Sequence, residues 1–432
     1  MNDFITIEEI IVDKIREFRT SKAYKQMIEG EKYYNGEVEE PLYHNFFKLL
    51  IDEKIDYFLS GTISFSADHE EYIKNIQKIL GKKFNSLLKK LAKESSKKGQ
   101  AWLNLYYDEQ MNLRMRMIKA EEIIPLYDTE DEDQLEAIIR FYNQEVYMNK
   151  ERKTITRVEY WTREDVNFYI LEDENKLILD SEKYLEEDYE GHYKKGNQVY
   201  TYPQIPFICF KNNEEKHSDF YHIAELIKSY SSNRYHLQSL LDEVREHIYL
   251  LKGYGGEDKR EFINDLNTYG ICKLEEDGDL SYLTPQIDTT ATEFHTNLLK
   301  KDIYLIGQGV NFLDENFNQS GIALKIKFRN LDLKVNNTEA QFKEAFQELM
   351  KFLLLEDQNI DIHFVRQQLV NELELIQSIS ESKNTGIISN ETLLSKHPFV
   401  TDIMKEKEKV KREQEEKLNL YDFTMKEESL NE

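Results

Sequence analysis

Cysteine, proline and glycine are all scarce in this 432-residue sequence, which contains two, six and sixteen of them. The two cysteines, Cys209 and Cys272, lie far apart without CxxC spacing or a nearby histidine pair. This pattern fits a reduced environment and argues against a structural zinc site. Together with 40% apolar and 32% charged residues, the composition indicates an ordered, helix-rich globular chain of roughly two or three domains.

Long apolar runs are also missing. The densest apolar patch, Met350 to Leu355, is much shorter than the ~20 residues that a membrane-spanning helix needs. The N-terminal segment has no basic stretch followed by an apolar one, so it does not resemble a secretion signal. We therefore expect no contact with a membrane.

An excess of positive charge, the usual mark of a protein that grips DNA, is missing as well. The formal net charge is -25, from 57 Lys and Arg against 82 Asp and Glu. Tight binding of nucleic acid relies on cationic side chains that neutralise phosphates and release counterions. The chain is therefore expected either not to bind DNA or to handle DNA without holding it.

Motifs that carry chemistry are missing too. The GYGG string at 253–256 lacks the Gly-Lys-Ser/Thr of a P-loop, and Gly307-Gln308-Gly309 does not follow a predicted strand, as a dinucleotide site would require. The ten histidines form no HExxH motif, and no GxSxG motif or distinctive pair of carboxylates is present. We expect no enzymatic activity, no metal site and no cofactor.

What the sequence does contain is helical periodicity on either side of a strand-rich stretch. Apolar spacing predicts helices over 7–34, 44–59, 70–98, 220–251, 290–306, 321–356 and 367–382, with a further short helix from Ser389. Alternation of apolar and polar residues predicts strands at 101–107, 113–117, 136–142, 156–161, 166–171 and 360–366.

A short β-like interruption separates two of the later helices. Residues 269–274 and 280–283 flank the turn signal Asp277-Gly278, which predicts a hairpin. Because two short strands are marginally stable alone, we expect them to pair across subunits of an oligomer. Thr290 and Glu293 fit a capping box at the start of the returning helix. The segment order predicts an antiparallel helix pair with a small distal module, and a helical hairpin within an ordinary domain fits the same pattern.

Several strings, taken in their order along the chain, resemble the portal proteins of long-tailed phages that infect Gram-positive bacteria. They are EKYYNGE (31–37), IDEKIDYFLSG (51–61), PFICFKNNEEKHSDF (206–220), HIYLLKGYGGEDKREF (247–262), SGIALK (320–325) and ISNETLLSKHPFV (388–400). The similarity runs from about residue 30 to residue 415. It departs from the family at Gly61-Thr62, where a proline is expected soon after the glycine, and this affects only the local turn.

The resemblance implies an α+β, mostly helical portal fold with named parts. The wing comprises residues 1–219 together with a long helix and a strand at 321–366. The remaining parts are stem helices at 220–252 and 288–306, a small β-containing clip at 253–287, a tunnel loop at 307–320, a helical crown at 367–415 and a flexible acidic tail at 416–432.

The resemblance also implies a function. Portal proteins form a ring, usually of about twelve subunits, at one capsid vertex, through which double-stranded DNA is packaged and ejected without sequence specificity. The implied partners are the terminase large subunit, the head-tail adaptor, and the major capsid and scaffolding proteins. The protein would reside in the virion, after assembly in the host cytoplasm.

Two other functions fit the composition. A structural adaptor without a channel would not need the Gly/Asn-rich segment at 307–320, and a nucleic-acid-processing enzyme would need a carboxylate metal cluster.

Two sets of residues are candidates for the contacts of a portal. The tunnel loop contains no Lys or Arg, so DNA could slide past it, while the cations that follow it could form a collar, although such charges are more often a solvated helix face. The predicted DNA-facing residues are Asn311, Asp314, Glu315, Asn316, Asn318, Lys325, Lys327 and Arg329. The predicted partner-binding residues of the clip are Tyr254, Glu257, Asp258, Lys259, Arg260 and Phe262.

Overall fold

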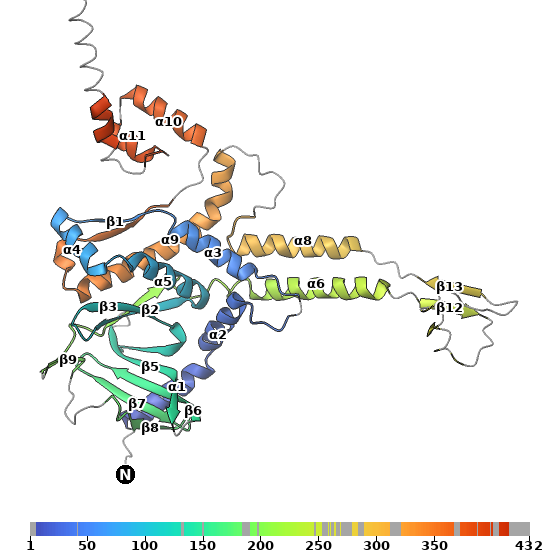
Figure 1. Ribbon diagram of the computed structural model, residues 1–432, viewed down its shortest axis with the longest axis horizontal. Coiled ribbons are helices and arrows are strands. Elements are labelled where there is room, and N and C mark those ends of the chain that lie inside the picture. The colour runs from blue at the N-terminus through green and yellow to red at the C-terminus, as the bar shows by residue number, and fades with distance from the viewer. Residues whose placement is uncertain are drawn as a thin grey trace, which may run out of the picture. The chain divides into compact units, whose positions relative to one another are not determined.

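The computed structural model describes most of the chain in two units (Figure 1). The first unit comprises Met1–Asn311 and Leu331–Arg366, and the second comprises Phe312–Asn330 and Gln367–Glu432. The residues outside the description are 1–5, 41, 131–133, 149–150, 184–190, 197, 246–247, 253–257, 259, 261–262, 265–267, 269–278, 284–288, 312–320, 367–371, 387, 398, 401–405 and 414–432. The last range contains the predicted acidic tail.

Five helices of the first unit precede its main sheets. They are α1 (Ile7–Thr20), α2 (Lys22–Asn35), α3 (Phe46–Phe58), α4 (Glu70–Leu80) and α5 (Phe84–Lys98). The predicted helix over 7–34 is wrong as one piece, because Ser21 has extended backbone and its hydroxyl accepts from the Tyr24 N–H, which starts a new helix. The predicted helix over 70–98 is likewise broken, at Gly81 with φ 69°.

A five-stranded antiparallel sheet follows, and α1 packs on it. Its strands are, in spatial order, β4 (Ile123–Tyr127), β5 (Leu135–Met148), β6 (Glu151–Trp161), β7 (Val166–Glu172) and β8 (Lys176–Leu179). Ile11 and Ile15 of α1 are fully or almost fully buried against Ile139, Phe141 and Val158. Full burial of such a side chain contributes about 1.5–3 kcal/mol, so this face fixes the helix on the sheet.

A second antiparallel sheet has the order β11-β2-β3. Its strands are β11 (Phe207–Lys211), β2 (Gln100–Tyr107) and β3 (Leu113–Ile118). The smaller elements nearby are the 3-10 turn η1 (Ala120–Glu122) and the paired strands β9 (Tyr193–Lys195) and β10 (Gln198–Tyr200). The strands predicted at 101–107, 113–117, 136–142, 156–161 and 166–171 are confirmed.

The long helix α9 (Gly321–Phe352) belongs to the first unit from Leu331 onwards. Its Phe342 ring lies 5.5 Å from that of Phe58 on α3 and 5.0 Å from that of Phe210 on β11. After the turn η2 (Glu356–Gln358), the predicted strand appears as β14 (Asp361–Phe364). Its antiparallel partner is β1 (Ile63–Ser66), a strand that the sequence analysis did not predict.

Two further helices of the first unit, α6 (Ala224–Arg245) and α8 (Thr289–Ile306), lie side by side (Figure 1). The helix predicted over 220–251 is too long, because residues 248–252 form the strand β12 (Ile248–Lys252). This strand pairs with β13 (Asp279–Leu283) of the same chain, Leu250 lying opposite Ser281.

The strand pairing expected across subunits stays a prediction for residues 280–283. Within the chain they pair with 248–252 along one edge, and a pair of two short strands is still only marginally stable alone. Residues 269–274, the other predicted strand, lie outside the described residues. The predicted capping box is wrong, since α8 begins at Thr289 and Thr290 lies inside the helix.

The second unit contains the first ten residues of α9, the helices α10 (Glu372–Thr385) and α11 (Asn390–Lys396), and a helical stretch at 406–413. Ser389 caps α11, because its hydroxyl accepts from the Thr392 N–H at 3.2 Å. The predicted helix from Ser389 is thus confirmed. The two units together are an α+β, mostly helical structure, as predicted.

Candidate channel and docking segments

The predicted DNA-facing residues are only partly described. Asn311 is half-buried at the end of the first unit, and Arg329 on α9 is exposed. The side chains of Lys325 and Lys327 lie outside the description, as do the loop residues Asp314, Glu315, Asn316 and Asn318. The described residues therefore do not test this set, and its role stays a prediction.

The predicted partner-binding residues of the clip are described at two positions. Asp258 and Arg260 are both exposed, and the Arg260 backbone N–H donates to Asp258 Oδ1 at 2.8 Å. The other four residues, Tyr254, Glu257, Lys259 and Phe262, lie outside the described residues. Their role in docking also stays a prediction.

The helix pair α6 and α8 is rooted on α3 through aromatic rings. The Phe46 ring of α3 lies edge-on to Tyr230 of α6 at 5.0 Å and to Tyr304 of α8 at 6.0 Å. Edge-to-face pairs of this kind contribute about 0.5–1.5 kcal/mol beyond their buried area. Further along, Asn233 of α6 forms a hydrogen bond with His295 of α8 at 2.8 Å. The start of α3 therefore positions both helices.

The C-terminal end of α8 is a compact cap formed by Gly307-Gln308-Gly309. The Gly309 N–H donates to the Tyr304 carbonyl at 3.0 Å and the Gln308 N–H to the Leu305 carbonyl at 3.3 Å, the Schellman arrangement. Gln308, at φ 56°, fills the left-handed position that glycine usually occupies. A Cβ atom at either glycine would lie within 2.8 Å of the Leu50 side chain. The two glycines therefore let the helix end pack closely on α3.

A buried cluster of polar and charged side chains lies under this cap. Lys54 of α3, whose side chain is 1% exposed, lies 3.1 Å from Asp219 Oδ2. Its Nζ also donates to Asn212 Oδ1 at 2.6 Å and to Ser96 Oγ at 3.0 Å. Asn212 in turn donates to Asp219 Oδ1 at 3.0 Å. The ammonium group of Lys54 therefore has three acceptors within the protein, as a buried lysine requires.

Two residues connect the cluster to the end of α8. Lys334 of α9 lies 3.3 Å from Asp219 Oδ2 and donates to the Gly307 carbonyl at 2.9 Å. Glu53 of α3 accepts from the Val310 N–H, with distances of 3.3 and 3.2 Å to its two carboxylate oxygens. The helix end is therefore held from both α3 and α9.

Burial and charge shift the pKa values of the cluster in different directions. Burial would raise the pKa of Asp219, but Lys334 and Lys54 outweigh it and lower that pKa to about 2. Burial lowers the pKa of Lys54 to about 8, against the attraction of Asp219. For Glu53 burial dominates and raises the pKa to about 7, although the Val310 N–H and Lys334 act against it. Glu53 therefore titrates close to neutral pH.

A second buried charge cluster lies where α2, α5 and η1 meet. The Lys98 side chain, which is 0% exposed, lies 2.6 Å from Glu94, 2.8 Å from Glu121 and 3.0 Å from Glu31. Lys97 also pairs with Glu31, at 2.6 Å. These contacts join the N-terminal helices to the turn that precedes the five-stranded sheet.

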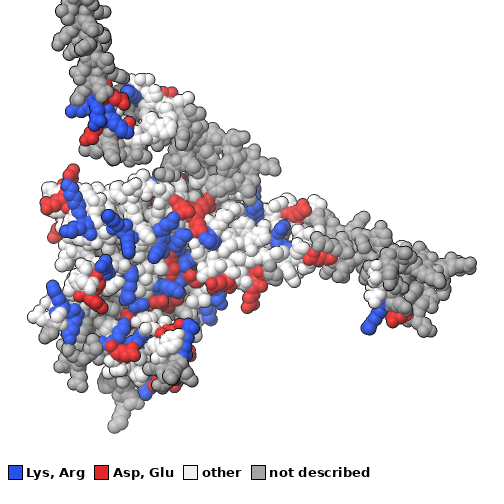
Figure 2. Space-filling view, viewed as in Figure 1, with Lys and Arg blue, Asp and Glu red and all other residues white. Residues whose placement is uncertain are grey.

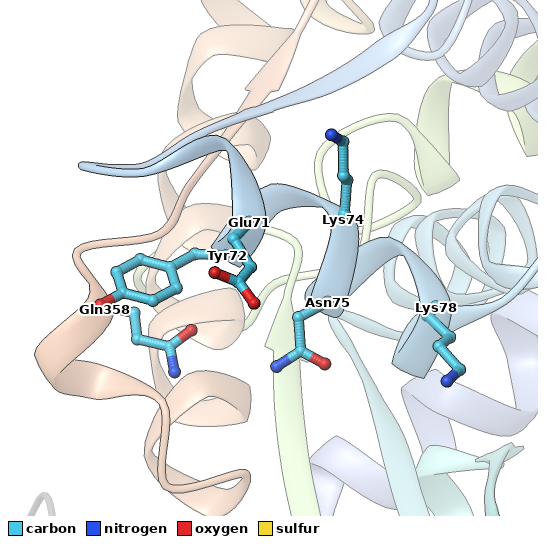
Figure 3. Close-up of a pocket in the computed structure, with 6 residues that line it drawn as sticks. All are labelled: Glu71, Tyr72, Lys74, Asn75, Lys78 and Gln358. Carbon is cyan, nitrogen blue, oxygen red and sulfur yellow. The ribbon is translucent and has the colours of Figure 1, made fainter.

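Sites for small-molecule chemistry do not emerge from the described residues. Among them, no group of three or more His, Cys, Asp or Glu is placed to hold a metal ion. Burial raises the pKa of Cys209 to about 11, which makes it a poor nucleophile. A surface depression beside α4 is lined by Glu71, Tyr72, Lys74, Asn75, Lys78 and Gln358, and its two lysine ammonium groups point away from each other (Figure 3).

Charges of both signs are interspersed on the surface. Figure 2 shows Lys and Arg side chains lying among Asp and Glu side chains over the visible face of the first unit. The net charge of -25 is thus not gathered into one acidic patch on this face. In the part of the chain that is described, no helix is both long and apolar enough to cross a membrane.

The residues of the cluster beside α8 were not predicted from the sequence, although one signal was present. The buried face of α3 carries Ile51, Ile55 and Phe58 at helical spacing, and Lys54 lies within that apolar stripe. A lysine on the buried face of a helix requires an acidic partner. The sequence holds no local sign that this partner is Asp219.

The comparisons with known proteins place the chain in a class. The model of the phage portal protein family, SPP1 Gp6-like, matches residues 14–419, and the chain belongs to this family. It is 32% identical over 388 residues to the portal protein of Clostridium phage phiCD119, covering 83% of this chain and 82% of that protein. It is 25% identical over 428 residues to the portal protein of Bacillus phage SPP1, covering 95% and 81%.

The fold has a relative among solved structures. A chain in the neck of an empty GTA particle, computed with C6 symmetry, is 12% identical and matches with a TM-score of 0.51, covering 85% of this chain and 92% of that one. The portal fold and the portal function expected from the sequence are therefore confirmed at the level of the family. The family consists of structural proteins of the phage particle.

Proposed function

We propose that this chain is the subunit of a closed ring of about twelve copies that forms the DNA channel at one vertex of a phage capsid. The observation that carries the proposal is the match to the portal family over residues 14–419. The shares of more than 80% of both curated relatives support a function of the whole chain.

Within this proposal each segment has a part. Residues 1–219 and 321–366 form the wing, and α6 and α8 form the stem. Residues 253–287 form the clip, which β12 extends, residues 307–320 form the tunnel loop, and residues 367–415 form the crown. The aromatic contacts of α3 with α6 and α8 support the division, since they root the stem on the wing.

A stripe on α8 is the surface that we assign to the neighbouring subunit. Phe294, Leu298 and Leu305 are 71%, 44% and 59% exposed and share one face of the helix. Leu299 and Ile303 are buried on the opposite face. A closed ring needs one face of each subunit to fit a different face of the next, and exposed apolar side chains at helical spacing suit such an interface.

This stripe can be tested with one charge. Leu298→Glu should shift the purified full-length protein from rings to smaller species, measured by native mass spectrometry, because a buried unpaired carboxylate opposes association. Asn75→Glu, which adds the same charge at an exposed position of α4, should leave the rings intact. Rings of unchanged size in Leu298→Glu would contradict the assignment.

Double-stranded DNA passes the channel without sequence-specific contacts. The support is the net charge of -25 and the absence of Lys and Arg from 307–320, which leave few cations to trap phosphates. Lys325, Lys327 and Arg329 form a limited cationic collar. Reversal of all three charges should reduce packaging of DNA, and packaging at the original level would remove the collar from the proposal.

The remaining partners are proteins. The clip, including Tyr254, Glu257, Asp258, Lys259, Arg260 and Phe262, docks the terminase large subunit and later the head-tail adaptor. The major capsid and scaffolding proteins surround the ring during assembly in the host cytoplasm. The chain acts without catalysis of its own, in keeping with a family of structural proteins.

Electron microscopy of the purified full-length protein tests the proposed function directly. A ring with a central hole wide enough for duplex DNA is the expected result. A closed assembly without a hole would favour a structural adaptor. Compact monomers that cleave DNA in the presence of magnesium would contradict the proposed function and indicate an enzyme instead.

A further inference from the structure

The end of α8 is held by side chains from two other helices. Its last carbonyls are satisfied by the Schellman cap, and two side chains from other helices then contact the cap itself. We propose that Glu53 and Lys334 are positioning residues, which hold the C-terminal end of α8 against α3 and α9 and so set the point from which the chain continues to residues 312–320.

The two contacts approach the cap from different helices. The Val310 N–H, which follows the cap, donates to the Glu53 carboxylate, and the Gly307 carbonyl accepts from Lys334 Nζ at 2.9 Å. Val310 is 3% exposed and Gly307 is buried. Neither backbone group could turn to water without moving the helix end, so each side chain is needed where it lies.

Close packing leaves the cap little room to move while these contacts hold. The Leu50 side chain of α3 fills the space beside both glycines, and a Cβ atom at Gly309 would lie 3.0 Å from Glu53 Oε2. A shift of the α8 end would therefore break the hydrogen bond of Glu53 and the packing of Leu50 together. The geometry favours two arrangements, held and released, over a gradual displacement.

Two charged or titratable groups face Glu53 from neighbouring helices, Lys334 from α9 and Tyr304 from α8. Lys54, which follows Glu53 on α3, pairs with Asp219 instead. Together with Asp219, these residues give a cluster of two carboxylates and two lysines. Burial brings the pKa of Glu53 to about 7, closer to neutral pH than the pKa of Lys54, about 8, or of Asp219, about 2.

The raised pKa fixes the sign of a pH effect. In the held arrangement the pKa of Glu53 is about 7, and once released into water it returns to its ordinary value of 4.5. The held arrangement therefore binds the proton more tightly and is favoured most below pH 4.5. Its advantage is lost progressively as the pH rises from 4.5 through 7, and little further change follows above pH 8.

Hydrogen exchange of the full-length protein tests these residues. Backbone exchange would be followed by mass spectrometry in peptides covering 303–311 between pH 4.5 and 8.5, each rate divided by that of an unstructured peptide at the same pH. With these two pKa values, protection in the original protein should fall roughly fortyfold between pH 5 and pH 7. Peptides from β2, in the core of the first unit, report global opening and should not follow this profile.

Three variants separate positioning from general stability. Glu53→Gln keeps an oxygen that accepts from Val310 but cannot titrate, so its protection should be independent of pH and at least as high as the original at pH 8. Glu53→Ala removes the acceptor and should lower protection at every pH. Asp56→Asn is the matched control on α3, since Asp56 is 65% exposed and pairs with Lys89, and it should reproduce the original profile.

Lys334→Met extends the test to the second contact. It removes the donor to Gly307 and the positive charge beside Glu53, so protection should fall and the pH at which it levels off should rise. Lys343→Met on the exposed side of α9, where Lys343 is 46% exposed, should change neither. Lys334→Met with the original profile would limit the positioning role to Glu53.

The inference fails if Glu53→Gln keeps the original pH dependence, if Glu53→Ala keeps the original protection, or if the peptides from β2 change in parallel with 303–311. The inference depends on the proposed function only where it treats residues 312–320 as part of a tunnel loop. Assemblies without a central hole would contradict that role, while the exchange profile would still show whether Glu53 holds the end of α8.

Discussion

Two buried charge clusters hold helices of this protein together, and they differ in how close the pKa values of their groups lie to neutral pH. In the first cluster, Lys98 and Glu31 both stay ionised. Burial would lower the pKa of Lys98, but Glu94 and Glu121 outweigh it and raise the pKa above its usual range. Burial likewise acts against Lys97 and Lys98 at Glu31, whose pKa falls to about 2. Around Glu53 the balance is reversed, and burial brings the pKa to about 7.

The difference comes from the number of opposite charges that each group contacts. Lys98 has three carboxylates within 3.0 Å, whereas Glu53 has one backbone N–H and only the more distant charge of Lys334, which already pairs with Asp219. Well-paired groups form a fixed tie between helices, and a poorly paired one is sensitive to pH. The sensitive group lies at the end of α8.

Removal of Lys98 should have the largest effect on stability. Lys98→Met leaves Glu121 without its lysine and leaves Glu31 and Glu94 with Lys97 alone, and should lower the free energy of unfolding by about 3–5 kcal/mol. Urea unfolding at pH 7 measures the loss. Lys89→Met removes an exposed lysine from its pair with Asp56 and should change stability by less than about 1 kcal/mol. Similar losses in the two variants would mean that the Lys98 cluster is not a tie.

Neutralising Asp219 should have a smaller effect, and one that depends on pH. Asp219→Asn leaves Lys54 and Lys334 without their counter-charge, and should lower the free energy of unfolding by about 2–3 kcal/mol at pH 7. The folded pKa of Asp219, about 2, lies below its ordinary 3.8. Its stabilisation is therefore present above pH 3.8 and lost as the pH falls towards 2.

The pH dependence supplies the control for Asp219. The difference in stability between the original protein and Asp219→Asn should shrink as the pH is lowered from 5 to 3, followed by urea unfolding. Asp13→Asn, at a position 65% exposed on α1, should show almost no difference at any pH. A difference that is constant with pH would mean that the charge of Asp219 contributes nothing.

Much of the fold could be predicted because its signals are local. The apolar stripe of α3 and the alternation at 113–117 each identify an element by themselves. Residues 248–252 could not be assigned in this way, since Ile248 and Leu251 fit helical spacing as well as a strand. Their pairing with 279–283, far along the chain, decides between the two. The breaks at Ser21 and Gly81 were missed because the apolar spacing continues across them.

The site was harder to predict than the fold. The hydrogen bond between Glu53 and Val310 joins residues 257 positions apart, and neither residue type is unusual in its local sequence. The Gly307-Gln308-Gly309 string lacked the context of a dinucleotide site, and its use as a helix cap against Leu50 depends on packing that the sequence does not show. Contacts between distant segments are set by the tertiary fold, and periodicity carries no information about them.

The same chemical change in the two clusters should alter stability in opposite directions. Glu31→Gln removes a carboxylate whose pKa is lowered to about 2, and should reduce the free energy of unfolding at pH 8 by about 1–2 kcal/mol after allowance for its partial exposure. Glu53→Gln removes a carboxylate whose charge is poorly compensated, and should raise it by about 1 kcal/mol at pH 8.

At pH 5 only one of the two variants should still differ in stability from the original protein. Glu53 is then protonated in the folded protein, so Glu53→Gln should bring no gain, whereas Glu31 is still ionised and Glu31→Gln should remain destabilising. Urea unfolding of both variants at pH 5 and pH 8 gives the four values. A loss of stability in both variants at pH 8 would mean that Glu53 is as well paired as Glu31, and the contrast between a fixed tie and a pH-sensitive contact would disappear.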